Sequence, residues 1–452
     1  MKYSLHVNMR EHINKQSRQL LEGVKKDPLE TPLPVDSLVF SPEYNPPQRS
    51  KRPEMDMSDM GAIKIYAKGH RDKYMEYKVV CHDMQLTLDA SEIETVYKLT
   101  SNLLKETLVA QTVSENFIFK TIIQWMVDNR HTPSNPASEL ADSVLAVFEK
   151  ASKKYAVYFP IQHLEMEGSI AVGRCIIGQA SKADIEKQVQ SYDGKGNNVE
   201  IIWLVRQHTC AKYEAQAEKE KALALAARQT ALSVDTLKIL FASWLPVDQP
   251  IVFDLDFKSQ YQESNKLMIQ AVDDLEDNQV THAQACSDEQ ITPYTFQKLE
   301  EAGLPILHDF LRSPGENPTE ICLLLINAIG NYADAVSHPS THDRITKIFT
   351  VLESLLLPSN TANILESLAR YLPKIISTHP QERKAIVKDV KSLYEIRSNF
   401  MHHARRDPFE LSMLVNLHDY TRRLLIAMIA FSHQWQTKQD MLNEIEERIN
   451  AA

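Results

Sequence analysis

The chain has 452 residues, of which 43% are apolar and 24% charged, and its formal net charge is −10. This composition is ordinary for a globular protein of two or three domains, and the negative charge excludes a general nucleic-acid coat, which needs a cationic surface. No run of about 18 apolar residues occurs, so the sequence predicts no membrane span. The five cysteines lack paired spacing, which indicates neither a disulfide framework nor a zinc site, and we expect a cytoplasmic protein without a metal or other cofactor.

The first 60 residues predict an N-terminal arm and a linker. Residues 10–25 form a polar segment without a helix breaker except Gly23, so we expect a helix there. Between Asp27 and Pro53 lie seven of the chain's 21 prolines. Because proline removes a backbone donor and interrupts helices, this stretch is predicted to be an extended arm or disordered.

Residues 61–290 combine helical and strand patterns, which predicts an α+β region with a sensory or regulatory role. Helices are expected at 91–105 with Ser91 as N-cap, and at 114–127, 138–153, 212–230 and 233–245. Alternating or clustered β-branched and aromatic residues predict strands at 63–66, 77–80, 155–161, 170–178, 199–205 and 251–257. An acidic loop is expected at 273–277.

Residues 291–452 predict only helices. Breaks rich in Pro, Ser, Asn and Thr separate segments at 293–312, 317–336, 341–357, 361–377, 381–404 and 408–434, the last with Pro408 in its first turn, and a solvated charged helix is expected at 438–449. Short connections between such helices favour antiparallel packing. The expected fold class is therefore α+β, with a mixed α/β N-terminal region followed by an all-α helical bundle.

One helix of this bundle carries a charge where an apolar residue is expected. In the segment 382–404, Ile386, Val390, Leu393 and Phe400 fall on one helical stripe, and Arg397 lies in the middle of that stripe. An arginine stays charged and is costly to bury alone. It therefore needs a carboxylate, a partner chain or a phosphate.

The residues around Arg397 resemble a known family. Arg397, followed by Ser398 and Asn399 and, after four intervening residues, by His402, is similar to the Arg-x4-6-His motif of HEPN domains. The stretches 393–396 and 351–356 resemble the Apea-like branch of that family, and the resemblance covers about 317–434. Family members often have Gly directly after the motif histidine, where this chain has His403.

This resemblance implies a metal-independent endoribonuclease, a hydrolase that acts on RNA as a homodimer through the helical bundle. It further implies a role in bacterial antiviral defence of the abortive-infection kind, with a phage-derived trigger at the N-terminal region. The alternative is a catalytically inert HEPN scaffold that dimerises and binds RNA or a protein partner.

Two side chains suffice for RNA cleavage without a metal. Histidine, whose ordinary pKa is about 6.5, suits removal of the ribose 2′-OH proton, and arginine donates two parallel hydrogen bonds to a phosphate. We therefore assign His402 as the base and Arg397 as the phosphate clamp, with a 2′,3′-cyclic phosphate as product. Five residues along a helix is about 500°, so the two side chains point about 140° apart. Either the reach of arginine or a distorted last turn brings them together, or two copies of the motif meet across a two-fold axis, which is what the resemblance favours. In the alternative reading, Arg397 pairs with a buried carboxylate and His402 is a surface residue.

Neighbouring polar residues are assigned by position. Ser398 and Asn399 are further catalytic candidates or part of a solvated face, and Ser398 lies one turn before His402. Glu353 falls in a strongly apolar helix and is predicted to pair with Arg397, which either orients the arginine or braces the core.

Positive charge is enriched near the motif. Residues 382–423 hold nine Lys or Arg and six Asp or Glu, a local excess of three positive charges. We predict RNA contacts by Lys391, Arg405 and Arg406, with a charged outer helix face as the alternative. His403 is predicted to be a further RNA contact or a stand-in base, and the alternative is that it fills the core or an interface.

Overall fold

The computed structural model describes residues 2–23, 25–28, 64–70, 73–81, 84–129, 136, 138–166, 168–179, 209–244, 246–255, 267–270, 289–291, 293–313, 318–358 and 363–451. Contacts divide the chain into two compact units, Met1–Tyr155 with Ala215–Ala224, and Ala156–Glu214 with Leu225–Ala452. Helices and sheets are both present, so the protein is of the α+β class. The three regions 1–60, 61–290 and 291–452 stay a prediction. Their limits were drawn from composition, and they do not coincide with the limits of these two units.

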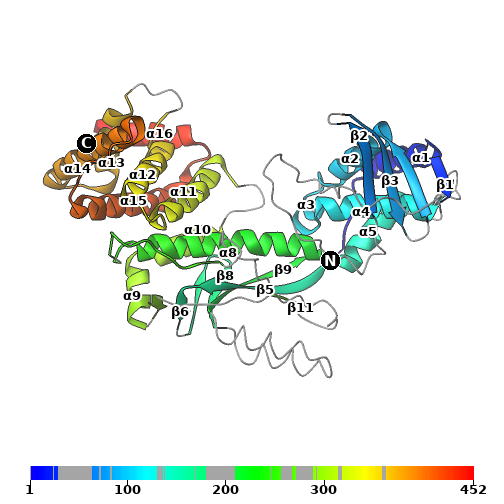
Figure 1. Ribbon diagram of the computed structural model, residues 1–452, viewed down its shortest axis with the longest axis horizontal. Coiled ribbons are helices and arrows are strands. Elements are labelled where there is room, and N and C mark those ends of the chain that lie inside the picture. Colours follow the sequence, from blue (N-terminus) through cyan, green and yellow to red (C-terminus); the bar gives the residue numbers. More distant parts are fainter. Residues whose placement is uncertain are drawn as a thin grey trace. The chain divides into compact units, whose positions relative to one another are not determined.

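The first unit combines five helices with a four-stranded antiparallel sheet among its described residues (Figure 1). The helices are α1 Val7–Gly23, α2 Ala90–Leu103, α3 Thr107–Thr112, α4 Glu115–Asn129 and α5 Leu140–Ala151. The sheet has the order β1-β4-β3-β2, with β1 Lys25–Pro28, β2 Lys64–His70, β3 Lys73–Cys81 and β4 Met84–Asp89. The predicted N-terminal helix is present, and it buries Ile13, Leu20 and Leu21 in the core of this unit.

The N-cap of α2 lies two residues before the predicted one. Asp89 Oδ1 accepts from the Glu92 N–H at 2.9 Å, and Glu92 Oε2 accepts from the Asp89 N–H at 2.7 Å, which is a complete capping box. The prediction of Ser91 as N-cap was wrong because Asp89, the last residue of β4, supplies the same acceptor earlier. The short helix α3 was not predicted.

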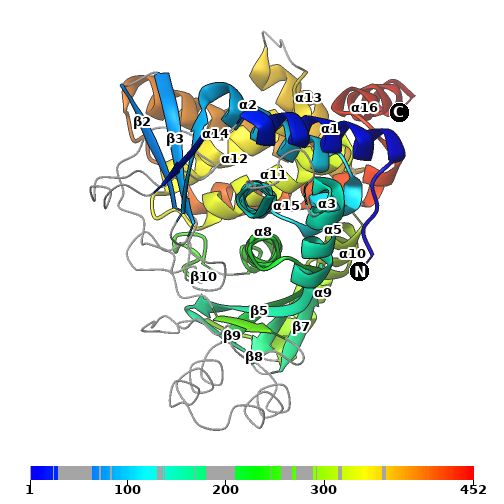
Figure 2. The ribbon, with the colours of Figure 1, turned by 90° about the vertical axis from the view of Figure 1, so that its right-hand side faces the viewer.

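The second unit contains a sheet covered by a long helix. The strand order is β10-β5-β9-β8-β7, and β11 (Leu267–Gln270) also pairs with β5. These strands are β5 Lys153–Gln162, β7 Ser169–Val172, β8 Cys175–Gln179, β9 Thr209–Ala217 and β10 Asp254–Leu255; β6 Leu164–Met166 pairs in parallel with β12 Glu289–Ile291. Helix α8 (Lys219–Phe241) runs over one face of the sheet (Figures 1 and 2), where Ser233 Oγ donates to Val172 O at 2.9 Å.

Three predictions in this part of the chain were wrong, and of the predicted strand 251–257 only Asp254–Leu255 is a strand among the described residues. The segment 170–178 is not one strand but the hairpin β7–β8, which turns at Gly173, where φ is 61°. The start of the predicted helix 212–230 belongs to β9, because the position of β9 between β5 and β8 in the sheet outweighs the helix propensity of its Ala and Glu residues. The two predicted helices then form one, α8. The proline-rich stretch beyond Pro28, the strand 199–205 and the loop 273–277 lie outside the described residues.

The C-terminal part of the second unit is helical, as predicted (Figure 1). The helices are α9 Pro293–Glu301, α10 Leu304–Arg312, α11 Glu320–Val336, α12 Thr341–Leu356, α13 Ile364–Ile376, α14 Pro380–His403, α15 Leu411–Phe431 and α16 Lys438–Ala451, with a 3-10 turn at Ser432–Gln434. Helices α11 to α15 bury a common apolar core, in which Phe349 of α12 meets the ring of Tyr394 of α14 edge to face at 5.2 Å.

Three details of the helical part differ from prediction. The segment 293–312 is broken at Gly303, whose φ of 111° ends α9 and starts α10. Helix α15 begins at Leu411 rather than at Pro408, because Glu410 already has the extended backbone of an N-cap. Helix α16 is not simply solvated: it buries Met441, Leu442 and Ile445.

Candidate functional site

Helix α14 carries the candidate site. Pro380 stands in its first turn, where the missing N–H costs nothing, and His403 is its last residue. Three residues of the predicted stripe are completely buried, namely Ile386, Val390 and Leu393, whereas Phe400 is half-buried. The helix is therefore anchored over its first four turns and less covered where the motif lies.

The helix ends directly after the motif. Ala404 has a left-handed backbone with φ of 51°, and its N–H donates to Asn399 O. Such a residue terminates an α-helix by satisfying a free carbonyl, and it is usually glycine. Here the left-handed position falls one residue beyond His403, so both histidines stay helical.

Arg397 points toward α12. Its Nη2 lies 3.3 Å from Glu353 Oε1 and 3.4 Å from Oε2, and its Nη1 donates to the Tyr394 hydroxyl at 3.2 Å. The guanidinium carbon lies 5.2 Å from the centre of the Tyr394 ring. Within the described chain, Nε is buried without a hydrogen-bond partner. The structure thus brings Arg397 and Glu353 together and fixes the guanidinium, yet 17% of the arginine side chain stays exposed.

Burial works against the charge of Glu353. Loss of water raises the pKa of this carboxyl above its ordinary value, and the nearby Arg397 partly offsets that rise. An isolated carboxylate in such surroundings would be costly, and the arginine makes its ionised form tolerable. The pair braces α12 against α14, whatever else it does.

His402 and His403 lie in solvent at the end of α14, with ring centres 6.5 Å apart. In the described part of the chain, no hydrogen bond or ion pair joins His402 to Arg397. This separation is the one expected from five helical steps. One copy of the chain therefore does not combine the two groups in a single cluster.

The two polar residues after Arg397 differ in their surroundings. Asn399 donates from Nδ2 to Asp407 Oδ2 at 2.7 Å, and its carbonyl accepts from the Arg405 N–H at 3.3 Å. Ser398 is half-buried, and no hydrogen bond joins it to His402 among the described residues. Asn399 thus fixes the connection after α14, and a catalytic role for either residue stays a prediction.

The predicted RNA-binding cations are exposed but unequally available. Lys391 pairs with Glu366 at 3.1 Å, and Arg405 pairs with Asp407. The Arg406 guanidinium carbon lies 5.9 Å from the centre of the Phe400 ring. The Arg406 guanidinium therefore lies at the end of the helix together with the exposed His402 and His403.

Exposed apolar side chains lie on both sides of this end. Met401 on α14 is 55% exposed, and Leu411 and Val415, one turn apart on α15, are 45% and 50% exposed. Exposed apolar residues indicate a contact surface where they adjoin one another, as Leu411 and Val415 do by helical spacing.

Another face of α14 borders a polar groove of about 580 Å³ that reaches the start of α15. Its charged lining has two cations and four carboxylates: Lys388, Arg405, Asp389, Glu395, Asp407 and Glu410. An acidic groove repels phosphate. This groove is therefore unsuited to an RNA phosphate.

The sequence patterns did not identify a buried arginine, Arg344 of α12. The side chain of Arg344 is 1% exposed; it donates from Nη1 to Val247 O at 2.6 Å and from Nε to His338 O, while Nη2 has no partner in the described chain. A signal was present, because Arg344 shares a helical stripe with Ile348, as Arg397 does with its neighbours.

Beside it lies a buried histidine, also missed. His418 of α15 faces the Tyr332 hydroxyl, which lies 3.0 Å from its Nδ1 and donates to its carbonyl at 3.0 Å. Burial and, secondarily, Arg344 lower the pKa of His418 to about 3, so this imidazole is neutral at neutral pH. It belongs to the core and not to a proton-transfer site on the surface.

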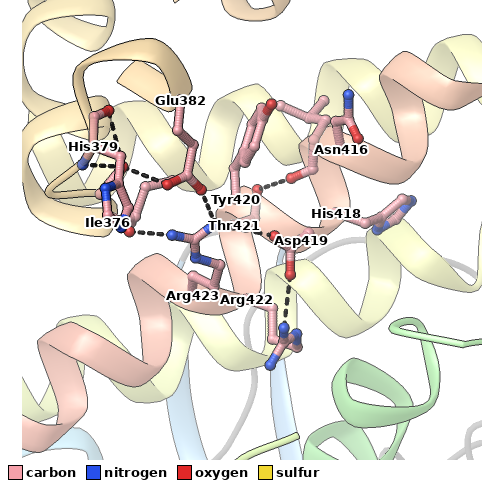
Figure 3. Close-up of polar contacts among 12 residues, drawn as sticks. Ile376, His379, Glu382, Asn416, His418, Asp419, Tyr420, Thr421, Arg422 and Arg423 are labelled. Atoms are coloured by element: carbon pink, nitrogen blue, oxygen red, sulfur yellow. Dashed lines mark hydrogen bonds and ion pairs between the residues drawn. The ribbon is translucent and has the colours of Figure 1, made fainter. Parts of the chain in front are cut away.

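A charged network joins α13, α14 and α15 (Figure 3). Arg423 donates from Nη1 to Glu382 Oε1 at 2.7 Å and to Asp419 Oδ2 at 3.4 Å, and from Nη2 to Ile376 O. Asp419 also pairs with Arg422 at 2.7 Å. Each of these arginines already has protein partners, so the network fixes helix ends and offers no free cation to a substrate.

No group of three or more His, Cys, Asp or Glu suited to a metal ion occurs among the described residues. In the same part of the chain, no helix combines the length and the apolar character that crossing a membrane requires. Comparisons with protein-family models, with curated proteins and with solved structures found no match to this chain.

Proposed function

We propose that the second unit carries a metal-independent endoribonuclease site of the HEPN type, with Arg397 as phosphate clamp and His402 as base, and that the protein acts in bacterial anti-phage defence. One observation carries the proposal. Arg397 is fixed by Glu353 and Tyr394 while remaining partly exposed, and the exposed His402 follows on the same helix.

The chemistry needs only these groups and RNA. His402 takes the proton of a ribose 2′-OH, the 2′ oxygen attacks the adjacent phosphorus, and the bond to the 5′ oxygen breaks, with that oxygen taking a proton from water. Arg397 stabilises the charge that develops on the phosphate oxygens. The products are a 2′,3′-cyclic phosphate and a 5′-hydroxyl.

A second copy of the chain completes the site. Within one copy, Arg397 and His402 point apart, whereas a two-fold axis near the end of α14 would bring the arginine of one copy to the histidine of the other. The exposed Met401, Leu411 and Val415 supply apolar area for such a contact.

The inert scaffold is the second candidate, favoured by the Arg397–Glu353 ion pair. An arginine that is satisfied within its own chain has less capacity to bind a phosphate. In that case α14 would serve dimerisation, and RNA or a protein partner would bind elsewhere.

Incubation of the purified protein with total RNA in EDTA separates the two candidates. The wild type is expected to cleave RNA and leave cyclic phosphate ends, and Arg397→Ala and His402→Ala are each expected to lower the rate by about 100-fold or more. His433→Ala is the matched control, because His433 is exposed on the turn after α15, away from the motif. Intact RNA with a preserved dimer would establish the scaffold.

A mixing experiment tests the shared site. If arginine and histidine come from different copies, mixing Arg397→Ala with His402→Ala protein restores about a quarter of wild-type activity, since half of the dimers are mixed and one of their two sites is intact. No recovery after subunit exchange would place both groups of each site in one copy. Val415→Asp places a charge on the exposed apolar surface of α15 and is expected to give a monomer in sedimentation. This monomer is expected not to cleave RNA.

A further inference from the structure

A second candidate binding site lies at the other end of α14. A cavity of about 150 Å³ opens between the ends of α13 and α15, the start of α14 and the last helix, α16. Its apolar lining includes Met428, Phe431, Trp435 and Ile445. From Arg383 to His402 the helix rises about 28 Å, so this cavity is separate from the motif.

The cavity has the size and lining of a site for one aromatic ring. A cavity of about 150 Å³ accommodates a molecule of the size of benzene. Phe431 is 39% exposed at its border, whereas Trp435 is almost fully buried. An aromatic surface that remains partly open to water beside a buried indole is suited to stacking with a planar ligand.

The polar lining is cationic. Lys374, Arg383 and Arg448 face one carboxylate, Glu444. That carboxylate is already engaged, because it accepts from the Trp435 indole N–H and pairs with Arg448, and these contacts hold its pKa below the ordinary value. The cavity therefore has an excess of two positive charges.

Two of these cations are available to a ligand. Arg383 donates from Nε to Ser377 O at 2.8 Å, which aligns its guanidinium but leaves the charge uncompensated. Lys374 is exposed. Neither has a carboxylate partner in the described part of the chain. Arg448 lies over Phe431, with its guanidinium carbon 5.1 Å from the ring centre, and so fixes the aromatic wall.

We propose that this cavity binds a small molecule that has a single aromatic ring and a carboxylate or phosphate group. The ring enters between Phe431 and Met428, and the anionic group lies toward Lys374 and Arg383. An aromatic ring alone would not account for the cations of the lining, and an anionic group alone would not account for its aromatic residues.

Calorimetry on the full chain with phenyl phosphate and with benzoate tests this site. At least one probe is expected to bind and to shift the indole N–H resonance of Trp435. Inorganic phosphate and benzyl alcohol, which each supply one half of the ligand, are expected to bind at least about tenfold more weakly. Lys374→Gln is expected to weaken binding about tenfold.

The matched control is Lys384→Gln, which removes the same charge from an exposed lysine of α14 that does not line the cavity. It is expected to leave binding unchanged. The proposal is overturned if neither aromatic anion binds, if phosphate or benzyl alcohol binds as well, or if the two lysine variants behave alike. None of these readouts depends on RNA cleavage, so this site and the ribonuclease proposal fail independently.

Discussion

Asn399 and Asp407 are joined by a hydrogen bond of 2.7 Å that ties the last turn of α14 to the connection leading into α15. The backbone carbonyl of Asp407 lies 2.9 Å from His342 Nε2 of α12. The orientation of the helix end that bears His402 therefore depends on a carboxylate outside the motif and on a histidine from another helix.

Loss of the hydrogen bond between Asn399 and Asp407 is expected to destabilise the C-terminal end of α14. Asn399→Ala should lower the free energy of unfolding by about 1 kcal/mol, because the half-buried Asp407 carboxylate loses a donor. Urea denaturation measures the change. Ser398→Ala is the matched control, and it should stay within about 0.5 kcal/mol of the wild type. Equal effects of the two substitutions would mean that the hydrogen bond contributes nothing of its own.

His418 should make stability depend on pH. Its pKa is lowered to about 3 in the folded protein from an ordinary value of 6.5, so between these values the unfolded chain binds the extra proton. Stability contributed by the neutral imidazole is thus fully present above pH 6.5 and is lost as the pH falls toward 3. Relative to His418→Asn, the wild type should lose up to about 1.4 kcal/mol per pH unit in this window, measured by urea denaturation at several pH values. Parallel pH profiles of the two proteins would contradict the prediction.

The contribution of Glu353 to stability should change with pH in the direction opposite to that of His418. Burial raises the pKa of Glu353 above the ordinary 4.5. Between pH 4.5 and the raised value, the folded state therefore holds a proton that the unfolded state has already released. The contribution of Glu353 to stability is therefore greatest below pH 4.5 and declines as the pH rises through the raised value. The difference in unfolding free energy between wild type and Glu353→Gln should shrink or change sign over that range. A difference that grows with pH would show that Arg397 outweighs burial.

Arg344 is expected to hold the connection after α8 against the helical bundle. Arg344→Met removes the donors to the Val247 and His338 carbonyls and should cost about 2 kcal/mol or more in urea denaturation. Arg370→Met, which breaks an exposed pair with Glu446, is the control and should change stability by less than about 1 kcal/mol. Unchanged stability of Arg344→Met would mean that removing a buried charge offsets both lost hydrogen bonds.

Local periodicity accounts for what the sequence predicted well and for where it failed. The helices from α11 to α15 follow from apolar residues at helical spacing, which holds whatever they pack against. The prediction failed for the first residues of the helix 212–230 because their assignment depends on the sheet, in which β9 lies between β5 and β8, strands more than 30 positions away in the chain. A local pattern contains no information on that pairing.

The sequence alone determined that α14 is a helix and that a charge lies in its apolar stripe, because both follow from a period of 3.6 residues. Helical spacing also places Tyr394 one turn before Arg397 and turns His402 away from it, and the pairing of Arg397 with Glu353 was a sequence prediction. Tertiary structure alone decided that α12 lies against α14, so that this ion pair forms within one copy of the chain. The reason is that ion pairs form between side chains that folding brings together, and Glu353 stands 44 positions before Arg397 in the chain. The neutral state of His418 and the tie between Asn399 and Asp407 were decided in the same way, by burial and by neighbours that no local pattern specifies.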